Sequence, residues 1–144
     1  MAIIDEGLEI LTEEECWALL GTAELGRVAI TVGALPAVLP VNFAVQDGDI
    51  VFLTGEGMKL RAALNRTVVA FEVDEFDTGR RSGWSVLAVG VAEEITGEHE
   101  VERARQLGLQ PWVGGDRTRL VRIRPEFLSG RRIVSASDAG SAAA

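Results

Sequence analysis

Residues 37–54, AVLPVNFAVQDGDIVFLT, contain the strongest indication of the fold class. Two β-rich runs, Ala37–Gln46 and Asp49–Thr54, flank the dipeptide Asp47-Gly48, which is typical of a tight two-residue hairpin turn. Strands joined in this way run antiparallel, because parallel neighbours need a long crossover connection. We therefore expect an antiparallel sheet rather than a repeating strand–helix–strand pattern.

Four further segments have the composition or the alternation of strands, and short helices are expected between them. The strands are residues 26–32, 68–74, 84–95 and 119–124, the last of which is stopped by Pro125. The run Thr12-Glu13-Glu14-Glu15 is a capping-box signature for a helix that ends near Gly21 or Glu24. Two more helices are expected, over residues 60–65 and from Thr96 or Gly97 to about Gly108.

Six strands with short loops and small peripheral helices predict a mainly β protein, a six-stranded antiparallel barrel. The barrel is expected to form one domain over residues 1–134. The remaining segment, residues 135–144, contains only Ser, Ala, Gly and Asp, and we expect it to be disordered.

Composition excludes several classes of function. The chain has 144 residues and a net charge of −8, from 14 basic and 22 acidic residues. So acidic a chain is not expected to bind nucleic acid or an anionic membrane, and no apolar run approaches the roughly 20 residues of a membrane span. Cys16 is the single cysteine, so no intrachain disulfide can form, and the cytoplasm is the expected location.

The side chains that usually carry catalysis are scarce. The chain has no tyrosine and one histidine, His99, in a charged segment that is typical of an exposed helix. No His and Cys cluster has metal-ligand spacing. The sequence therefore predicts neither a catalytic residue nor a metal site, and a bound cofactor is expected to supply any redox or transfer chemistry.

Lys59 is the one lysine among fourteen basic residues, and it ends the turn Thr54-Gly55-Glu56-Gly57-Met58-Lys59. Glycines let a backbone approach an anion closely, the start of a helix offers free N–H groups, and lysine adds a positive charge. These features together favour a phosphate site. The alternative is a plain turn with a surface lysine.

Two other features favour a planar ligand. Pro40 interrupts the strand at Pro40-Val41-Asn42-Phe43, which would leave backbone groups available to read the edge of a ring. Trp84-Ser85 and Trp112 lie beside glycine or proline, where tryptophans often stack on ligands or lie at interfaces. The alternatives are an edge strand for the first feature and core packing for the tryptophans.

The order of these segments resembles the pyridoxamine 5′-phosphate oxidase-like family of split-barrel proteins. The matching pieces are residues 25–29, 40–43, 54–60, 69–74, 83–86, 123–125 and 130–133. The resemblance implies a homodimer with two FMN sites at the subunit interface. It also implies three sets of cofactor contacts. The phosphate and the ribityl chain would be contacted by Thr54, Gly55, Gly57, Met58 and Lys59. The isoalloxazine ring would lie along Pro40, Val41, Asn42 and Phe43, and the rest of the flavin site would be completed by Trp84, Ser85 and Trp112.

The activity of the family's namesake is not expected. Residues 130–133, GRRI, lack the histidine of the family's late Arg-x-His motif, and the chain has no tyrosine. We instead expect an FMN-dependent oxidoreductase that acts on a small molecule of unknown identity and mainly orients its cofactor. The alternatives are FAD or the deazaflavin F420 as cofactor, a flavin-storage or sensor module without turnover, and a dimeric structural domain that has lost its cofactor.

Overall fold

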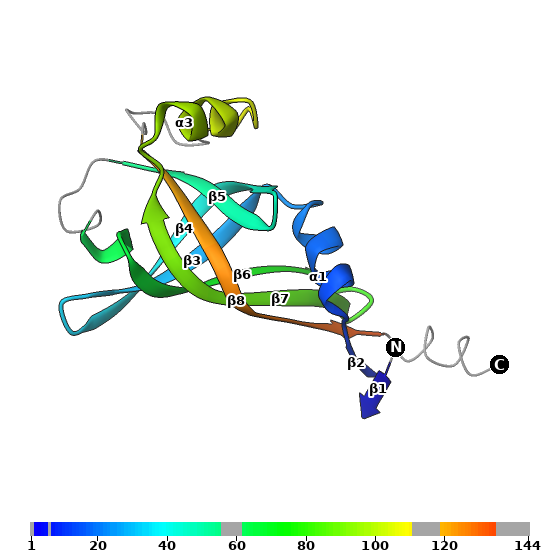
Figure 1. The fold of residues 1–144 in the computed structure, drawn as a ribbon. Coiled ribbons are helices and arrows are strands. Elements are labelled where there is room, and N and C mark those ends of the chain that lie inside the picture. Colours follow the sequence, from blue (N-terminus) through cyan, green and yellow to red (C-terminus); the bar gives the residue numbers. More distant parts are fainter. Residues whose placement is uncertain (1, 6, 56–61, 111–118, 135–144) are drawn as a thin grey trace.

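The computed structural model describes residues 2–5, 7–55, 62–110 and 119–134. In these ranges the chain forms eight strands and two helices, and residues 62–64 are also helical (Figure 1). The elements in chain order are β1 (Ala2–Asp5), β2 (Leu8–Ile10), α1 (Glu13–Leu20), β3 (Leu25–Val32), β4 (Leu35–Gln46), β5 (Asp49–Thr54), β6 (Thr67–Asp77), β7 (Ser82–Glu94), α3 (Glu98–Arg105) and β8 (Arg119–Ile133).

Six of these strands close into a ring. Their order is β8-β5-β4-β3-β6-β7, and β7 pairs with β8 to complete the circuit. Every pairing is antiparallel, which confirms the predicted six-stranded antiparallel barrel. The β1–β2 hairpin was not predicted; it joins the edge of β8 and extends away from the barrel (Figure 1).

Local sequence signals explain the first helix and the central hairpin. The Thr12 side chain accepts a hydrogen bond from the Glu15 backbone N–H, and the Glu15 carboxylate accepts one from the Thr12 backbone N–H, so the capping box is confirmed. Asp47 and Gly48 both have positive φ values, 50° and 78°, as a primed two-residue turn requires. Gln46 and Asp49 pair on either side of it.

The prediction that Pro125 ends the last strand is wrong. β8 continues to Ile133, because the proline lies at a bulge where its missing N–H removes no regular ladder bond. Gly90 pairs with Pro125 and Val89 with Phe127, so Glu126 is the extra residue. A Cβ at Gly90 would overlap the Arg124 carbonyl, which explains the glycine opposite the bulge.

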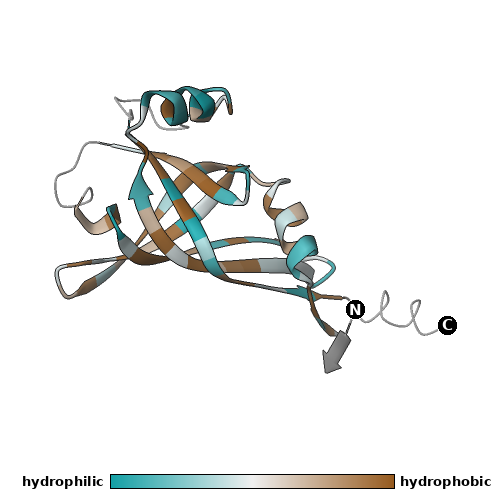
Figure 2. Ribbon diagram, in the orientation of Figure 1, coloured by the Kyte–Doolittle hydropathy of each residue, from teal (hydrophilic) through white to brown (hydrophobic). Residues whose placement is uncertain are grey.

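The barrel interior is apolar, and α1 and α3 pack against different parts of the barrel. Phe43 and Phe71 meet edge to face inside it, with ring centroids 4.9 Å apart. α1 buries Cys16 and Leu20 against this core, while α3 covers a separate, smaller cluster on the outer side of β5 and β8, made of Val51, Ile95, Ala104 and Leu120. The outer side of α3 is hydrophilic (Figure 2). No helix in the described ranges is long and apolar enough to cross a membrane.

Candidate functional site

β4 changes its partner strand in the middle, and this change creates the candidate site. Its first half pairs with β3, ending at Leu25 opposite Asn42, and its second half pairs with β5, starting at Phe43 opposite Phe52. Beyond Phe43 and Phe52 the two strands separate, and we call this point the strand fork. Among the described strands, each half of β4 therefore has one edge without a strand partner, although the Phe43 N–H donates to the Glu24 carbonyl.

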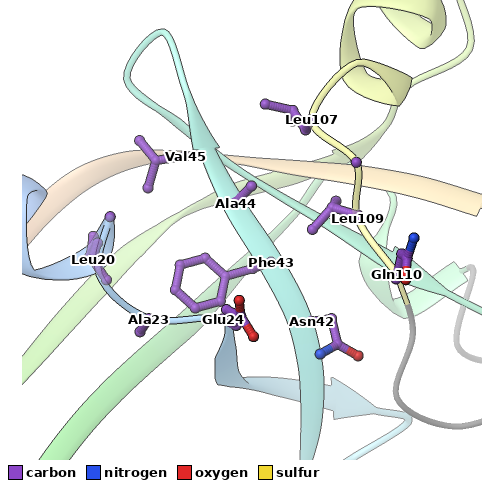
Figure 3. A pocket seen from close by; sticks show the side chains of 12 residues that line it. Leu20, Ala23, Glu24, Asn42, Phe43, Ala44, Val45, Leu107, Leu109 and Gln110 are labelled. Carbon is purple, nitrogen blue, oxygen red and sulfur yellow. The ribbon is translucent and has the colours of Figure 1, made fainter.

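A cavity of about 550 Å³ lies over the second half of β4 (Figure 3). Residues 42–45 form its floor, residues 20–24 between α1 and β3 form one wall, and residues 107–110 after α3 form the other. Most of its lining side chains are apolar, with Glu24, Asn42 and Gln110 gathered toward one end, although polar groups, including those of the backbone, make up more of its surface than apolar groups do. Glu24 carries the one ionisable side chain among these described lining residues, and the sequence analysis did not single it out.

The open end of the barrel, which we call the barrel mouth, lies on the β5 side of the strand fork. The side chains that point into the barrel change from apolar to polar at this end of two strands. On β5 the change is from Phe52 to Thr54, and on β7 it is from Ala92 to Glu94. Arg119 begins β8 directly opposite Thr54, and its guanidinium donates to Glu94 Oε1 at 2.9 Å. Gly55 and Asn65 complete a small hollow around this pair. Neither Arg119 nor Glu94 was a candidate in the sequence analysis, because an Arg at a strand start has no distinctive local pattern.

The other predicted cofactor residues are distributed unevenly. Val41 is buried in the core and Pro40 is exposed on the outside of β4. Trp84 packs in the core at 9% exposure, ten residues along β7 from Glu94, which is on the order of 30 Å. Its neighbour Ser85 is half-buried on the other face of β7. Within one chain, Trp84 and Ser85 therefore lie far from the end of β7 that contains Glu94.

The remaining predicted residues are Gly57, Met58, Lys59 and Trp112, and they lie outside the described residues. Gly55 and Gln110 are the last described residues before the segments that contain them. Gly55 borders the hollow at the barrel mouth, and Gln110 lines the cavity. His99 is exposed on α3, as predicted.

The outer face of β6, β7 and β8 carries apolar side chains that no described element covers. Val68, Leu87 and Phe127 are 69%, 38% and 54% exposed, and Ala70, Val89 and Phe127 form one row across the three strands. We call these residues, with Val91, the outer apolar patch. A patch of this kind on a soluble protein commonly marks an interaction site.

A charged cluster adjoins that patch. Arg27 Nη1 lies 3.4 Å from Glu72 Oε1 and 3.3 Å from Asp74 Oδ2. Burial, and then the hydrogen bond and charge of Asp74, raise the pKa of Glu72 to about 7, and Arg27 opposes the shift only in part. Glu72 therefore exchanges a proton near neutral pH.

A closed antiparallel ring with a strand fork, a cavity on one side of the fork and a polar barrel mouth on the other defines a split-barrel protein. The model of the pyridoxamine 5′-phosphate oxidase family matches residues 12–132. The chain belongs to this family.

Known relatives agree with this membership. An uncharacterized protein of Mycobacterium tuberculosis is 39% identical over 132 residues, which cover 88% of this chain and 86% of that protein. The structure of an FAD-binding protein from Mycobacterium smegmatis is similar with a TM-score of 0.77 and 38% identity, covering 88% of this chain and 98% of the other. An FAD-binding protein from Mesorhizobium loti has a TM-score of 0.68 and 26% identity, covering 87% and 97%.

Proposed function

We propose that this protein binds a flavin nucleotide at the strand fork and works as a flavin-dependent oxidoreductase. The observation that carries the proposal is the cavity floored by residues 42–45, on the strand predicted to read a flavin ring. Its size, and its apolar side chains with three polar side chains gathered at one end, are compatible with a site for a flat organic cofactor. The two FAD-binding relatives support the same cofactor class.

The donor set at the fork fits such a molecule. The edge of β4 that has no partner among the described strands offers backbone N–H and C=O groups to a ring edge, and the side-chain amides of Asn42 and Gln110 line the same cavity. No atom of the described residues lies within 4 Å of a Cβ built on Gly55. A phosphate group could therefore approach the backbone there, and we assign Thr54, Gly55 and the nearby Lys59 to it.

We favour FMN, the smaller of the two flavin nucleotides, with FAD as the second candidate. FMN needs one site for its ring and one for its phosphate. We assign the ring to the cavity over β4 and the phosphate to the turn at Gly55. The names of the two relatives favour FAD, whose adenylate half would need additional surface. The long acidic tail of F420 is less compatible with a net charge of −8.

When bound, the flavin would supply the hydride or electron chemistry, and the chain's own residues would orient and shield it. The apolar walls, Leu20 and Ala23 on one side and Leu107 and Leu109 on the other, would exclude water from the ring. Glu24 lies at the polar end of the cavity. We assign it no catalytic role.

We also propose that two copies pair through the outer apolar patch. A homodimer is the arrangement that the family resemblance implies, and the patch supplies an uncovered apolar surface on three neighbouring strands. The partner could then contribute to the site residues that one chain keeps far from its own Glu94, such as Ser85.

One experiment separates an oxidoreductase from a storage or sensor module. Bound flavin is photoreduced without oxygen, and its reoxidation by oxygen and by quinone or nitro acceptors is followed by absorbance. In an oxidoreductase, the rate of flavin reoxidation, or its selectivity among the acceptors, is expected to differ strongly from that of free reduced flavin. A module that only stores flavin would leave the selectivity among acceptors as it is in solution.

A further inference from the structure

We propose that Arg103 is a positioning residue for the flavin cavity, because it ties the helix that carries one wall of the cavity to the strand that forms its floor. Gln46 and Asp47, at the end of that strand, hold it. The proposal rests on the flavin site of the preceding section. It adds three residues that do not themselves line the cavity.

The wall at residues 107–110 depends on where α3 lies. α3 ends at Arg105, and the chain runs from the helix directly into Leu107 (Figure 3). The Leu107 N–H donates to the Ala104 carbonyl, and the Gly108 N–H donates to the Arg105 carbonyl. These bonds fix the start of the wall to the last turn of the helix. A shift of α3 would therefore shift the wall with it.

Arg103 joins this helix to the strand under the cavity. Residues 42–45 of β4 form the floor, and the next two residues along the chain both contact Arg103. The Gln46 side-chain amide donates to the Arg103 backbone carbonyl at 3.1 Å. The Arg103 guanidinium donates through Nη2 to Oδ2 of Asp47. One residue of α3 is thus attached to the floor strand through both its backbone and its side chain.

Close packing does not hold all of α3 on the barrel. The helix buries one side chain, Ala104, in the small cluster on the outer side of β5 and β8. Beside this cluster lies a second cavity, of about 410 Å³, whose lining includes Asp47, Glu100, Arg103 and Arg122. Arg122 Nη1 donates to Glu100 Oε2 at 2.8 Å, so charged contacts reach α3 from two neighbouring elements across this hollow. The position of the helix therefore depends partly on ion pairs.

The strength of the Arg103–Asp47 pair suits an adjustment of position. The two side chains are 49% and 68% exposed, and a pair so open to water shifts an equilibrium by at most about fivefold. That is too little to decide whether the chain folds, but enough to change how often the wall stands over the floor. Salt screens such a pair. Flavin binding should therefore weaken at high salt even for a ligand that carries no charge.

Flavin affinity is the first test. Flavin-free protein is titrated with FMN and with riboflavin, which has the same ring and no phosphate. Arg103→Gln and Asp47→Asn are each expected to weaken both ligands by about two- to fivefold, because the wall serves the ring. Asparagine suits the positive φ of Asp47, so the hairpin turn is kept. The double variant should bind no more weakly than the weaker single variant, since both substitutions remove one contact.

Salt dependence and hydrogen exchange give readouts that a general loss of stability would not move in this way. Raising the salt concentration should weaken riboflavin binding to the wild type more than to Arg103→Gln. In flavin-free protein, backbone amides of residues 98–110 should exchange faster in Arg103→Gln and in Asp47→Asn, while those of the barrel strands should not change. Arg105→Gln is the matched control, because Arg105 is exposed on the same helix and its removal changes the net charge equally. It should leave affinity and exchange unchanged.

The outcomes separate this proposal from the proposed function. Unchanged exchange over residues 98–110 in Arg103→Gln would overturn the tie between α3 and β4. Faster exchange with unchanged riboflavin affinity, or single effects that add up fully in the double variant, would overturn the positioning role and leave the flavin site standing. A wild-type protein that binds neither flavin would overturn the proposed function, whereas faster exchange in the variants would still support the tie.

Discussion

Ala44 and Val51 are register partners on β4 and β5, yet their surroundings differ. Val51 is 2% exposed in the cluster that α3 covers, whereas Ala44 is only half-buried because the cavity lies over it. The small side chain of Ala44 thus keeps open the volume that we assign to the flavin ring.

Ala44→Phe is expected to fill part of that cavity and to weaken the binding of FMN and riboflavin alike, by about tenfold or more. Both ligands should be affected because the ring, rather than the phosphate, loses its space. Fluorescence titration measures both affinities. Val38→Phe, at a 63% exposed position of the same strand, is the control and should leave them unchanged. Normal flavin affinity in Ala44→Phe would place the ring elsewhere.

Phe127→Glu is expected to break the homodimer without unfolding the chain. Phe127 is 54% exposed at one end of the Ala70–Val89–Phe127 row, and a charge there would have to be buried in an apolar interface. Light scattering coupled to size exclusion gives the mass. Phe76→Glu is the control, because Phe76 is equally exposed, at 53%, but lies near the β6–β7 turn outside the patch. A dimer that survives Phe127→Glu would mean that another surface pairs the subunits.

Glu72 is expected to make stability depend on pH near neutrality. Its pKa rises from an ordinary 4.5 to about 7, chiefly through burial, so the folded chain holds this proton more tightly than the unfolded chain does. The stabilisation is complete below about pH 4.5 and is lost as the pH rises toward 7. The side chain is 36% exposed, which makes the effect modest.

Melting temperatures between pH 4.5 and 8 measure this contribution. Glu72→Gln is expected to raise the melting temperature at pH 8 and to flatten its dependence on pH. Glu126→Gln changes the charge equally at an exposed position of the β8 bulge, and it should follow the wild-type pH profile. Parallel profiles for the wild type and Glu72→Gln would show that Glu72 does not titrate in this range.

Most of the barrel could be predicted from local sequence. The Asp47-Gly48 turn, the Thr12 capping box and the alternation of 68–74 each depend on neighbouring residues, and the structure has all three features. The continuation of β8 past Pro125 could not be predicted, because the bulge depends on Gly90 of another strand. The β1–β2 hairpin was missed for a similar reason, since its short strands depend on the edge of β8.

The candidate site could be predicted only in part. Asn42 and Phe43 were chosen because Pro40 was expected to interrupt their strand; both line the cavity, although β4 runs through Pro40, which pairs with Arg27. The contributions of Glu24, Gln110 and Arg119 arise from segments that meet only in the folded chain. Trp84 illustrates the limit of composition, because core packing was the stated alternative to ligand stacking and the structure buries its side chain.

The absorption spectrum of the purified protein, together with the mass of any small molecule released on denaturation, tests flavin binding most directly. We predict that the protein shows the absorption bands of a flavin in the blue region of the spectrum and releases a molecule with the mass of FMN. Any flavin-free fraction is expected to bind added FMN. A released mass of FAD would keep the site and change the nucleotide. A colourless protein that binds neither FMN nor FAD when they are added would contradict the account.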